Sequence, residues 1–130
     1  MPKQPSEKFA KGMDIRRKVL GNKHVDKAEA NKTDFDKSFQ ELITENAWGN
    51  VWQGNQFSLR ERSIVTLALL ASLGHWEEFQ MHVRASKNTG ATKDDIREVL
   101  MHVAIYAGVP TANKGFKLAK LVFAEDDQTS

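Results

Sequence analysis

The stretch SLRERSIVTLALLA, residues 58–71, decides the fold of this 130-residue chain. Ser58 and Glu61 have the spacing of a capping box, which predicts that a helix begins there. The apolar residues that follow cover every side of that helix, a pattern typical of a helix buried within a domain. We therefore expect a buried central helix with other elements packed around it.

Helical apolar spacing continues on the N-terminal side of this segment. Thr33 is a candidate helix cap, and a stripe of apolar residues with helical spacing follows it. The stripe consists of Phe35, Phe39, Leu42, Ile43 and Ala47. It predicts a helix that ends near Trp48 and Gly49.

Helices are also predicted on the C-terminal side. After Gly74 we expect a helix that Gly90 ends as a left-handed cap, because glycine adopts positive φ without steric cost. Thr92 opens the next helix, which stops near Gly108. Pro110 suits the first turn of a final helix.

Helices are also predicted towards both ends of the chain. The final helix is expected to reach about residue 124, with a frayed polar tail over 125–130. Two shorter helices are predicted over residues 6–20 and 24–30, and residues 49–57 form the substantial internal loop. The sequence therefore predicts a single all-α domain over 1–130, a bundle of about six to seven helices.

Composition excludes several classes of protein. The chain is 40% hydrophobic and 28% charged, which is ordinary for a globular domain, and it has no cysteine. Disulfide scaffolds, thiolate zinc sites and thiol nucleophiles are therefore excluded. Because no apolar run approaches the ~20 residues that cross a bilayer and no signal peptide is recognisable, we expect a cytoplasmic protein without a membrane partner.

The charge is concentrated in a basic N-terminal segment. Residues 1–32 hold nine Lys or Arg against four Asp or Glu, although the formal net charge of the chain is only +2. Phe9 is the one aromatic residue of this segment, so stacking side chains do not alternate with the basic ones. We therefore expect no nucleic-acid partner and interpret the segment as a solvated basic face or a contact with an acidic subunit.

The segment GHWEEFQMHVR, residues 74–84, carries the strongest chemical pattern. Glu78 stands four residues before His82, so the two are neighbours on a helix. A carboxylate can orient an imidazole and raise its basicity, which suits an acid or base near neutral pH. The alternative is that His82 is a core histidine bonded to Glu78.

Further polar residues could converge with His82 on a small anionic ligand inside the bundle. Arg62 and Arg84 suit carboxylates, while His102 and Tyr106 lie one turn apart. Each residue also has a purely structural interpretation. The two arginines could be surface ion-pair partners, and His102 and Tyr106 could simply pack on each other. Trp52, in the internal loop, is either a ligand contact or an anchor of that loop.

A metal site is the less favoured alternative. His75, Glu78 and His82 span two helical turns, but His75 is expected at the helix start, which leaves Glu78 and His82 on one face. No third or fourth ligand can be named, and no side chains that would hold the ligands in place are visible. We therefore predict chemistry without a metal.

Several blocks of sequence, in order, resemble the 4-carboxymuconolactone decarboxylase family. The blocks are Met13–Asp26, Ala47–Gly49, Val51–Trp52, Leu59–Ser63, Glu77–Arg84 and Tyr106–Asn113. The resemblance covers about residues 8–124. It implies the all-α fold of the wider alkyl hydroperoxidase D-like superfamily.

The redox members of that superfamily carry a Cys-x-x-Cys and a following histidine on one helix. Here the cysteine positions read His75 and Glu78, and the histidine is retained as His82. The glutamate of the redox proton relay falls at Ser63. The resemblance therefore implies the fold and a role for His82, and it excludes peroxidase activity.

For this chain the resemblance implies a step of protocatechuate catabolism in the β-ketoadipate pathway. In this step 4-carboxymuconolactone loses CO2 and becomes β-ketoadipate enol-lactone, with no cofactor. The expected roles are His82 as proton donor, Glu78 as its orienting partner, Arg62 or Arg84 as carboxylate anchor, and Tyr106 or His102 as oxyanion donor. Family likeness also implies a homo-oligomer, expected to be a hexamer built as a trimer of dimers.

Two alternatives stay open. The chain could be a helical domain that binds a small anion without catalysis, because a fold does not dictate a function. It could also decarboxylate a related lactone.

Overall fold

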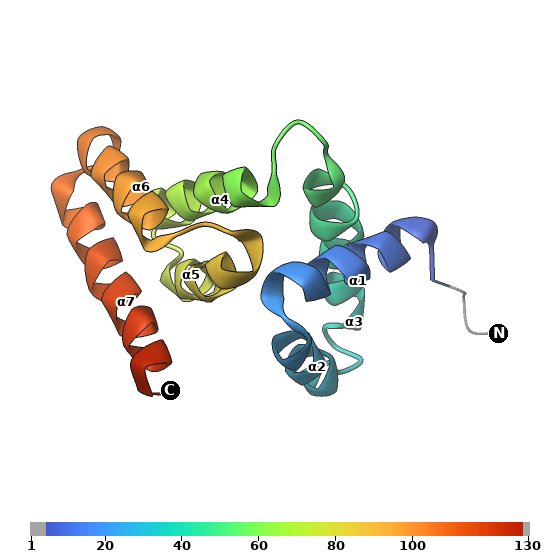
Figure 1. Ribbon diagram of the computed structural model, residues 1–130. Helices are drawn as coiled ribbons and strands as arrows, with labels where there is room; N and C mark the ends of the chain where they lie inside the picture. Colours follow the sequence, from blue (N-terminus) through green and yellow to red (C-terminus); the bar gives the residue numbers. More distant parts are fainter. Residues whose placement is uncertain (1–4, 129–130) are drawn as a thin grey trace. The chain divides into compact units, whose positions relative to one another are not determined.

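The protein is described over residues 5–128 from a computed structural model. Within these residues the chain forms seven α-helices, two short helical turns and no β-strand, so the all-α prediction is confirmed (Figure 1). The helices are α1 (Glu7–Leu20), α2 (Asn22–Asn31), α3 (Lys37–Ile43), α4 (Leu59–Leu73), α5 (Trp76–Thr89), α6 (Lys93–Tyr106) and α7 (Val109–Gln128). The turns are the π-helical η1 (Thr44–Trp48) and the 3-10 turn η2 (Val51–Gln53). None of the helices in this part of the chain is both long and apolar enough to cross a bilayer.

Contacts between residues divide the chain into two compact units. The first runs up to Ser58 and the second begins at Leu59. The prediction of one domain over 1–130 is not tested by this division and stays a prediction. Each unit has its own packing.

Local capping signals explain where several helices begin and end. The Ser6 hydroxyl accepts a hydrogen bond of 3.0 Å from the Phe9 backbone N–H at the start of α1. Gly90 has φ +90° and ends α5 in the left-handed conformation, as predicted. Thr92 and Asp95 form a complete capping box at the start of α6.

The first unit depends on a close approach between α1 and η1. A Cβ atom at Gly12 would collide with the Thr44 carbonyl oxygen and lie 2.9 Å from the backbone nitrogen of Gly49. Glycine at position 12 therefore lets the two backbones touch. Trp48 of η1 and Trp52 of η2 are both buried, with ring centroids 4.8 Å apart.

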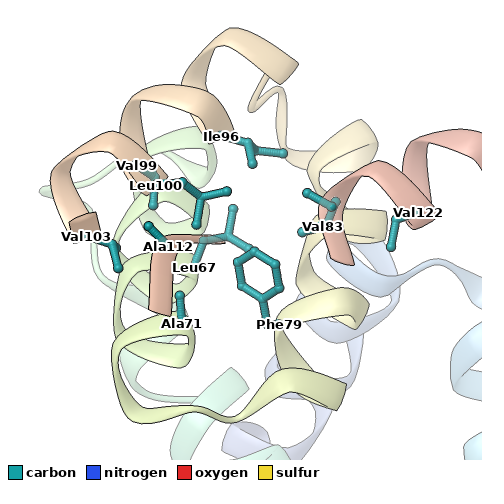
Figure 2. Packing of buried hydrophobic residues seen from close by; sticks show 11 residues of the cluster. Leu67, Ala71, Phe79, Val83, Ile96, Val99, Leu100, Val103, Ala112 and Val122 are labelled. Carbon is teal, nitrogen blue, oxygen red and sulfur yellow. The ribbon is translucent and has the colours of Figure 1, made fainter. Parts of the chain in front are cut away.

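In the second unit, α4–α7 pack around one apolar cluster (Figure 2). Phe79 from α5 is fully buried, and its ring lies beside Leu67 and Ala71 of α4. Leu100 from α6 and Val122 from α7 close the cluster. Full burial of one phenylalanine, leucine or valine side chain stabilises a fold by about 1.5–3 kcal/mol.

The expectation of a buried central helix holds for only one side of α4, which buries Ser63, Leu67 and Ala71. α5, α6 and α7 all contact α4, yet Val65, Leu69 and Leu73 remain exposed. The apolar pattern reports how much surface the helix must cover. It does not say which sides of the helix other elements pack against.

The predicted polar tail over 125–130 is also wrong for the part that the structure describes, because α7 continues to Gln128. Glu125 pairs with Arg84 and Asp126 pairs with Lys87, both from α5. These ion pairs hold the last turns of α7 against α5. Residues 129 and 130 lie outside the described part.

An ion pair joins the start of α4 to the start of α6. Arg60 donates from Nε and Nη2 to the two carboxylate oxygens of Asp95, over 2.8 and 2.6 Å. These bonds from Arg60, followed by those from Thr92, hold the pKa of Asp95 well below its usual range. One carboxylate therefore caps α6 and binds α4.

The close approach in the first unit predicts the effect of Gly12→Ala. In an ordinary helix this change is stabilising by about 1 kcal/mol. Here the added methyl group meets backbone atoms that cannot move aside, so we expect a loss of about 1–3 kcal/mol in the free energy of unfolding. Urea denaturation measures this, and a gain in stability would contradict the contact. Ala10→Gly, on the exposed side of α1, is the matched control.

The capping carboxylate predicts a pH-dependent effect of Asp95→Asn. Since the folded-state pKa of Asp95 is lowered, its stabilising contribution is present above its unfolded pKa of about 4 and is lost as the pH falls further. The urea midpoint of the variant should lie below that of the wild type at pH 7, and the gap should narrow steadily as the pH falls below about 4. Asp94→Asn, on the same turn, should change little at any pH. A gap between Asp95→Asn and wild type that stays constant as the pH falls below about 4 would contradict this role.

Candidate functional site

His82 is a buried polar residue of α5. Its side chain is only 7% exposed, and its neighbours Phe79, Val83 and Ser86 on the same helix are buried too. A histidine in such surroundings has little bulk water around it. This is the setting in which a single proton donor can be kept for a bound substrate.

Glu78 occupies a different environment from His82. It precedes His82 by one turn, as the spacing predicted, but it lies in the exposed part of α5. In the stretch from residue 5 to residue 128, no hydrogen bond or ion pair joins the two side chains. The orienting role expected for Glu78 stays a prediction.

A buried pair of hydroxyl groups joins α4 to α5. Ser63 Oγ donates to Thr89 Oγ1 over 2.7 Å, and both residues are buried. The adjacent Arg62 is half-buried on α4. Sequence reasoning missed this contact, because the pairing of two short polar side chains depends on how the two helices align.

Arg84 is engaged at the surface. Its Nε and Nη2 donate to the carboxylate of Glu125 over 3.0 and 2.8 Å, and this pairing lowers the pKa of Glu125. Both side chains are about half exposed. The surface ion pair that was the plain alternative for Arg84 is therefore the arrangement observed.

His102 and Tyr106 form a stacked pair on α6. Their ring centroids are 4.9 Å apart with an angle of 24° between the rings, and both residues are exposed. They line a groove of about 510 Å³ between α4 and α6. The other lining residues are Arg60, Ile64, Ala68, Ser72, Asp95, Glu98, Val99 and Val103. His82, Arg62 and Arg84 do not line this groove.

The remaining candidates lie elsewhere. Trp52 belongs to the first unit, where it packs on Trp48 as an anchor of its loop. His75 is the N-cap residue of α5 and is exposed. Over residues 5–128, no three His, Cys, Asp or Glu side chains gather as a possible metal site, so His75, Glu78 and His82 do not form one.

The arrangement offers two separate chemical environments in the second unit. One is the buried imidazole of His82 on α5, near the packed helix α4 that carries Arg62. The other is the open groove with the stacked pair on α6. The first can deliver a proton to a bound anion away from water.

Comparison with known proteins identifies relatives of the chain. The model of the family described as "Carboxymuconolactone decarboxylase family" matches residues 37–121. The chain is 40% identical to the 4-carboxymuconolactone decarboxylase of Acinetobacter baylyi, over 92% of this chain and 89% of the relative. It is 42% identical to the nitrosuccinic acid decarboxylase of Metarhizium robertsii, over 79% of this chain and 72% of the relative. A 4-carboxymuconolactone decarboxylase from Pseudomonas putida is 43% identical over 34% of this chain and 92% of the relative.

The family match spans most of α3 to α7 and includes α5 with His82. The similarity to the Acinetobacter protein extends along nearly the whole of both chains. This chain belongs to the carboxymuconolactone decarboxylase family.

Proposed function

We propose that the protein catalyses the cofactor-independent decarboxylation of 4-carboxymuconolactone to β-ketoadipate enol-lactone and CO2, a step of protocatechuate catabolism. The observation that carries this proposal is the 40% identity with the Acinetobacter 4-carboxymuconolactone decarboxylase over 92% of the chain. A buried histidine on α5 supports it, because the reaction needs a proton donor protected from water.

The substrate itself can accept the electron pair that remains when CO2 leaves. Its leaving carboxylate is attached to a ring carbon that is conjugated through the ring alkene to the lactone carbonyl. When the bond to CO2 breaks, its electron pair shifts the alkene and leaves an enolate on the carbonyl oxygen. A proton added to the carbon beside that carbonyl completes the enol-lactone, so the protein must supply binding, polarisation and one proton.

His82 is proposed as the proton donor. An imidazolium can release a proton near neutral pH, and the low exposure of His82 restricts competing donation by water. After one turnover the imidazole regains its proton from solvent. The net reaction then consumes one proton for each CO2 released.

Arg62 is proposed as the anchor for the substrate's side-chain carboxylate. Arg84 lies at the surface, where its side chain is about half exposed and donates to Glu125. Arg62 is half-buried on α4, next to the Ser63–Thr89 contact that holds α4 against α5. Its guanidinium can bind a carboxylate through two parallel hydrogen bonds.

The roles of the other predicted site residues depend on where the substrate lies. Glu78 would orient His82 only if its exposed carboxylate turned towards the imidazole on binding. Tyr106 or His102 would donate to the enolate oxygen only if the substrate reached the groove that they line. Trp52 would contact substrate from its loop.

The main test is turnover by the purified protein. Ultraviolet absorbance and CO2 release are followed after enzymatically prepared 4-carboxymuconolactone is added. We expect rapid turnover in wild type, and in His82→Gln a loss of about 10² or more, the usual scale for a missing general acid. His75→Gln, at the exposed N-cap position of the same helix, should stay near the wild-type rate.

Two results would contradict this reading. A folded wild-type protein that binds the lactone without releasing CO2 would favour the alternative of a non-catalytic domain that binds a small anion. A folded His82→Gln variant with wild-type turnover would remove His82 from the mechanism.

The two arginines predict different kinetic effects. Arg62→Gln should raise KM by roughly 10- to 100-fold, because a charge-assisted contact contributes about 1.5–3 kcal/mol. Arg84→Gln should leave KM close to wild type and lower only thermal stability, since it removes the surface pair with Glu125. Steady-state kinetics and circular dichroism melts separate the two, and the reverse pattern would make Arg84 the anchor.

A second substrate is favoured by the similarity to the nitrosuccinic acid decarboxylase. Nitrosuccinic acid is a dicarboxylic acid whose nitro group can accept the electrons of a departing carboxylate. A panel that contains this acid, 4-carboxymuconolactone and lactones with altered ring substituents distinguishes these assignments by kcat/KM. The best substrate of the panel defines the activity.

We also propose a cytoplasmic homo-oligomer, with the predicted hexamer of three dimers as its form. The apolar residues left exposed on α3, α4 and α6 support self-association. Light scattering after size-exclusion chromatography measures the stoichiometry.

A further inference from the structure

Arg16 is a buried charged residue on α1. Its side chain is only 7% exposed, and no other Lys, Arg, Asp or Glu whose burial the structure describes is buried. It lies on the same face of α1 as Gly12 and Val19, which are buried too. Taking a guanidinium out of water costs free energy unless hydrogen bonds replace those made to water. We therefore expect partners for the N–H groups of Arg16.

The hydrogen bonding of Arg16 uses only part of its guanidinium. Nη1 donates to Glu29 Oε1 over 3.2 Å. Within residues 5–128 the side chain makes no other hydrogen bond or ion pair. An arginine also carries N–H donors on Nε and Nη2, which form one edge of its planar group. This Nε–Nη2 edge of Arg16 has no partner in the described part of the chain.

Two other arginines of the chain bind a carboxylate through the same edge. Arg60 donates from Nε and Nη2 to Asp95. Arg84 donates from the same two nitrogens to Glu125. Two parallel hydrogen bonds from this edge match the spacing of carboxylate oxygens. Arg16 is far more buried than either arginine, so it gains more from a partner of this kind.

The charges beside Arg16 do not balance. Glu29 accepts hydrogen bonds from Arg16 at Oε1 and from Lys32 at Oε2, over 3.2 and 2.7 Å. The bond from Lys32, together with the charges of both cations, lowers the pKa of Glu29, so its carboxylate is ionised at neutral pH. The Lys32 and Glu29 side chains are only 23% and 27% exposed. One carboxylate therefore serves two cations, and a second anion would neutralise the remaining positive charge.

A small anion has access to Arg16. Within residues 5–128, none of its nitrogens that lack a hydrogen bond is sealed from water. A carboxylate that displaces this water gains two charge-assisted hydrogen bonds. Because so little of the side chain is exposed, the opening suits a single carboxylate better than a protein surface.

We propose that the Nε–Nη2 edge of Arg16 binds the carboxylate of a small organic acid. Glu29 holds the guanidinium in place through Nη1, and Lys32 adds a second positive charge nearby. The three residues come from α1 and the C-terminal end of α2, so the site lies within the first unit. This inference does not rest on the proposed activity.

The first experiment is an NMR titration of the ¹⁵N-labelled wild type with succinate at constant ionic strength. The Nε–H signal of Arg16, assigned by its loss in Arg16→Lys, should move downfield and saturate. The corresponding signals of Arg60 and Arg84 should stay in place, because their edges already bind carboxylates. Succinamide, which has a similar size and no charge, should move none of these signals.

The second experiment measures succinate binding to variants by calorimetry. Arg16→Lys keeps the charge but removes the two parallel donors, so the affinity should fall by about 10-fold or more. Arg17→Lys is the matched control, since Arg17 is the next residue and pairs with Asp26. It should bind succinate like wild type. Lys32→Gln leaves Arg16 intact and should lower the affinity by about 3-fold or more, because one cation is lost. Circular dichroism checks that each variant is folded.

Kinetics with 4-carboxymuconolactone identifies the acid that uses the site. Competitive inhibition by succinate, with a raised KM in Arg16→Lys, would assign the site to the side-chain carboxylate of the substrate. Succinate binding with an unchanged KM would assign it to a separate organic acid. The leaving carboxylate is not a candidate, because a cation there would stabilise the substrate more than the transition state that leads to neutral CO2.

Three results would overturn the proposal. The Arg16 signal could stay unmoved while succinate is added to a large excess. Sodium chloride or succinamide could move it as far as succinate does, which would indicate a general effect of the solution. Arg17→Lys could lose as much affinity as Arg16→Lys. None of these measurements needs turnover, so their failure is distinct from a failure of the proposed activity.

Discussion

The contact of Phe79 with Leu67 is the interaction on which the second unit depends. It joins α5 to α4 at the centre of the apolar cluster, and α6 and α7 complete the cluster around it. Since His82 follows Phe79 by three residues, the same packing that buries the phenyl ring turns the imidazole inward. The position of the proposed proton donor is therefore a consequence of the core.

Local features of the fold could be predicted from the sequence because their causes are local. Gly90 and Thr92 act at helix ends through a left-handed backbone or hydrogen bonds that neighbouring residues determine. The exposure of Leu69 and the length of α7 could not be predicted in this way. They depend on which surfaces meet and on ion pairs such as Arg84–Glu125, which join residues far apart in the chain.

The same distinction between local and non-local causes applies to the candidate site. The spacing of Glu78 and His82 correctly placed them one turn apart, but it could not tell that one is exposed and the other buried. His102 and Tyr106 were correctly paired on one helix face. The groove that they line lies between α6 and α4. The sequence alone does not show how these two helices align.

In the proposed reaction the substrate accepts the electron pair that the departing CO2 leaves behind, and the protein supplies one buried proton donor. The central claim is that His82 delivers that proton to one face of the ring. The most direct measurement is decarboxylation of 4-carboxymuconolactone in D2O, with the product analysed before exchange by NMR in the presence of a chiral solvating agent, because the two monodeuterated products are mirror images. The account predicts one deuterium on a single face of the carbon beside the lactone carbonyl. Equal labelling of both faces would contradict it, because the proton would then come from solvent and not from a fixed residue.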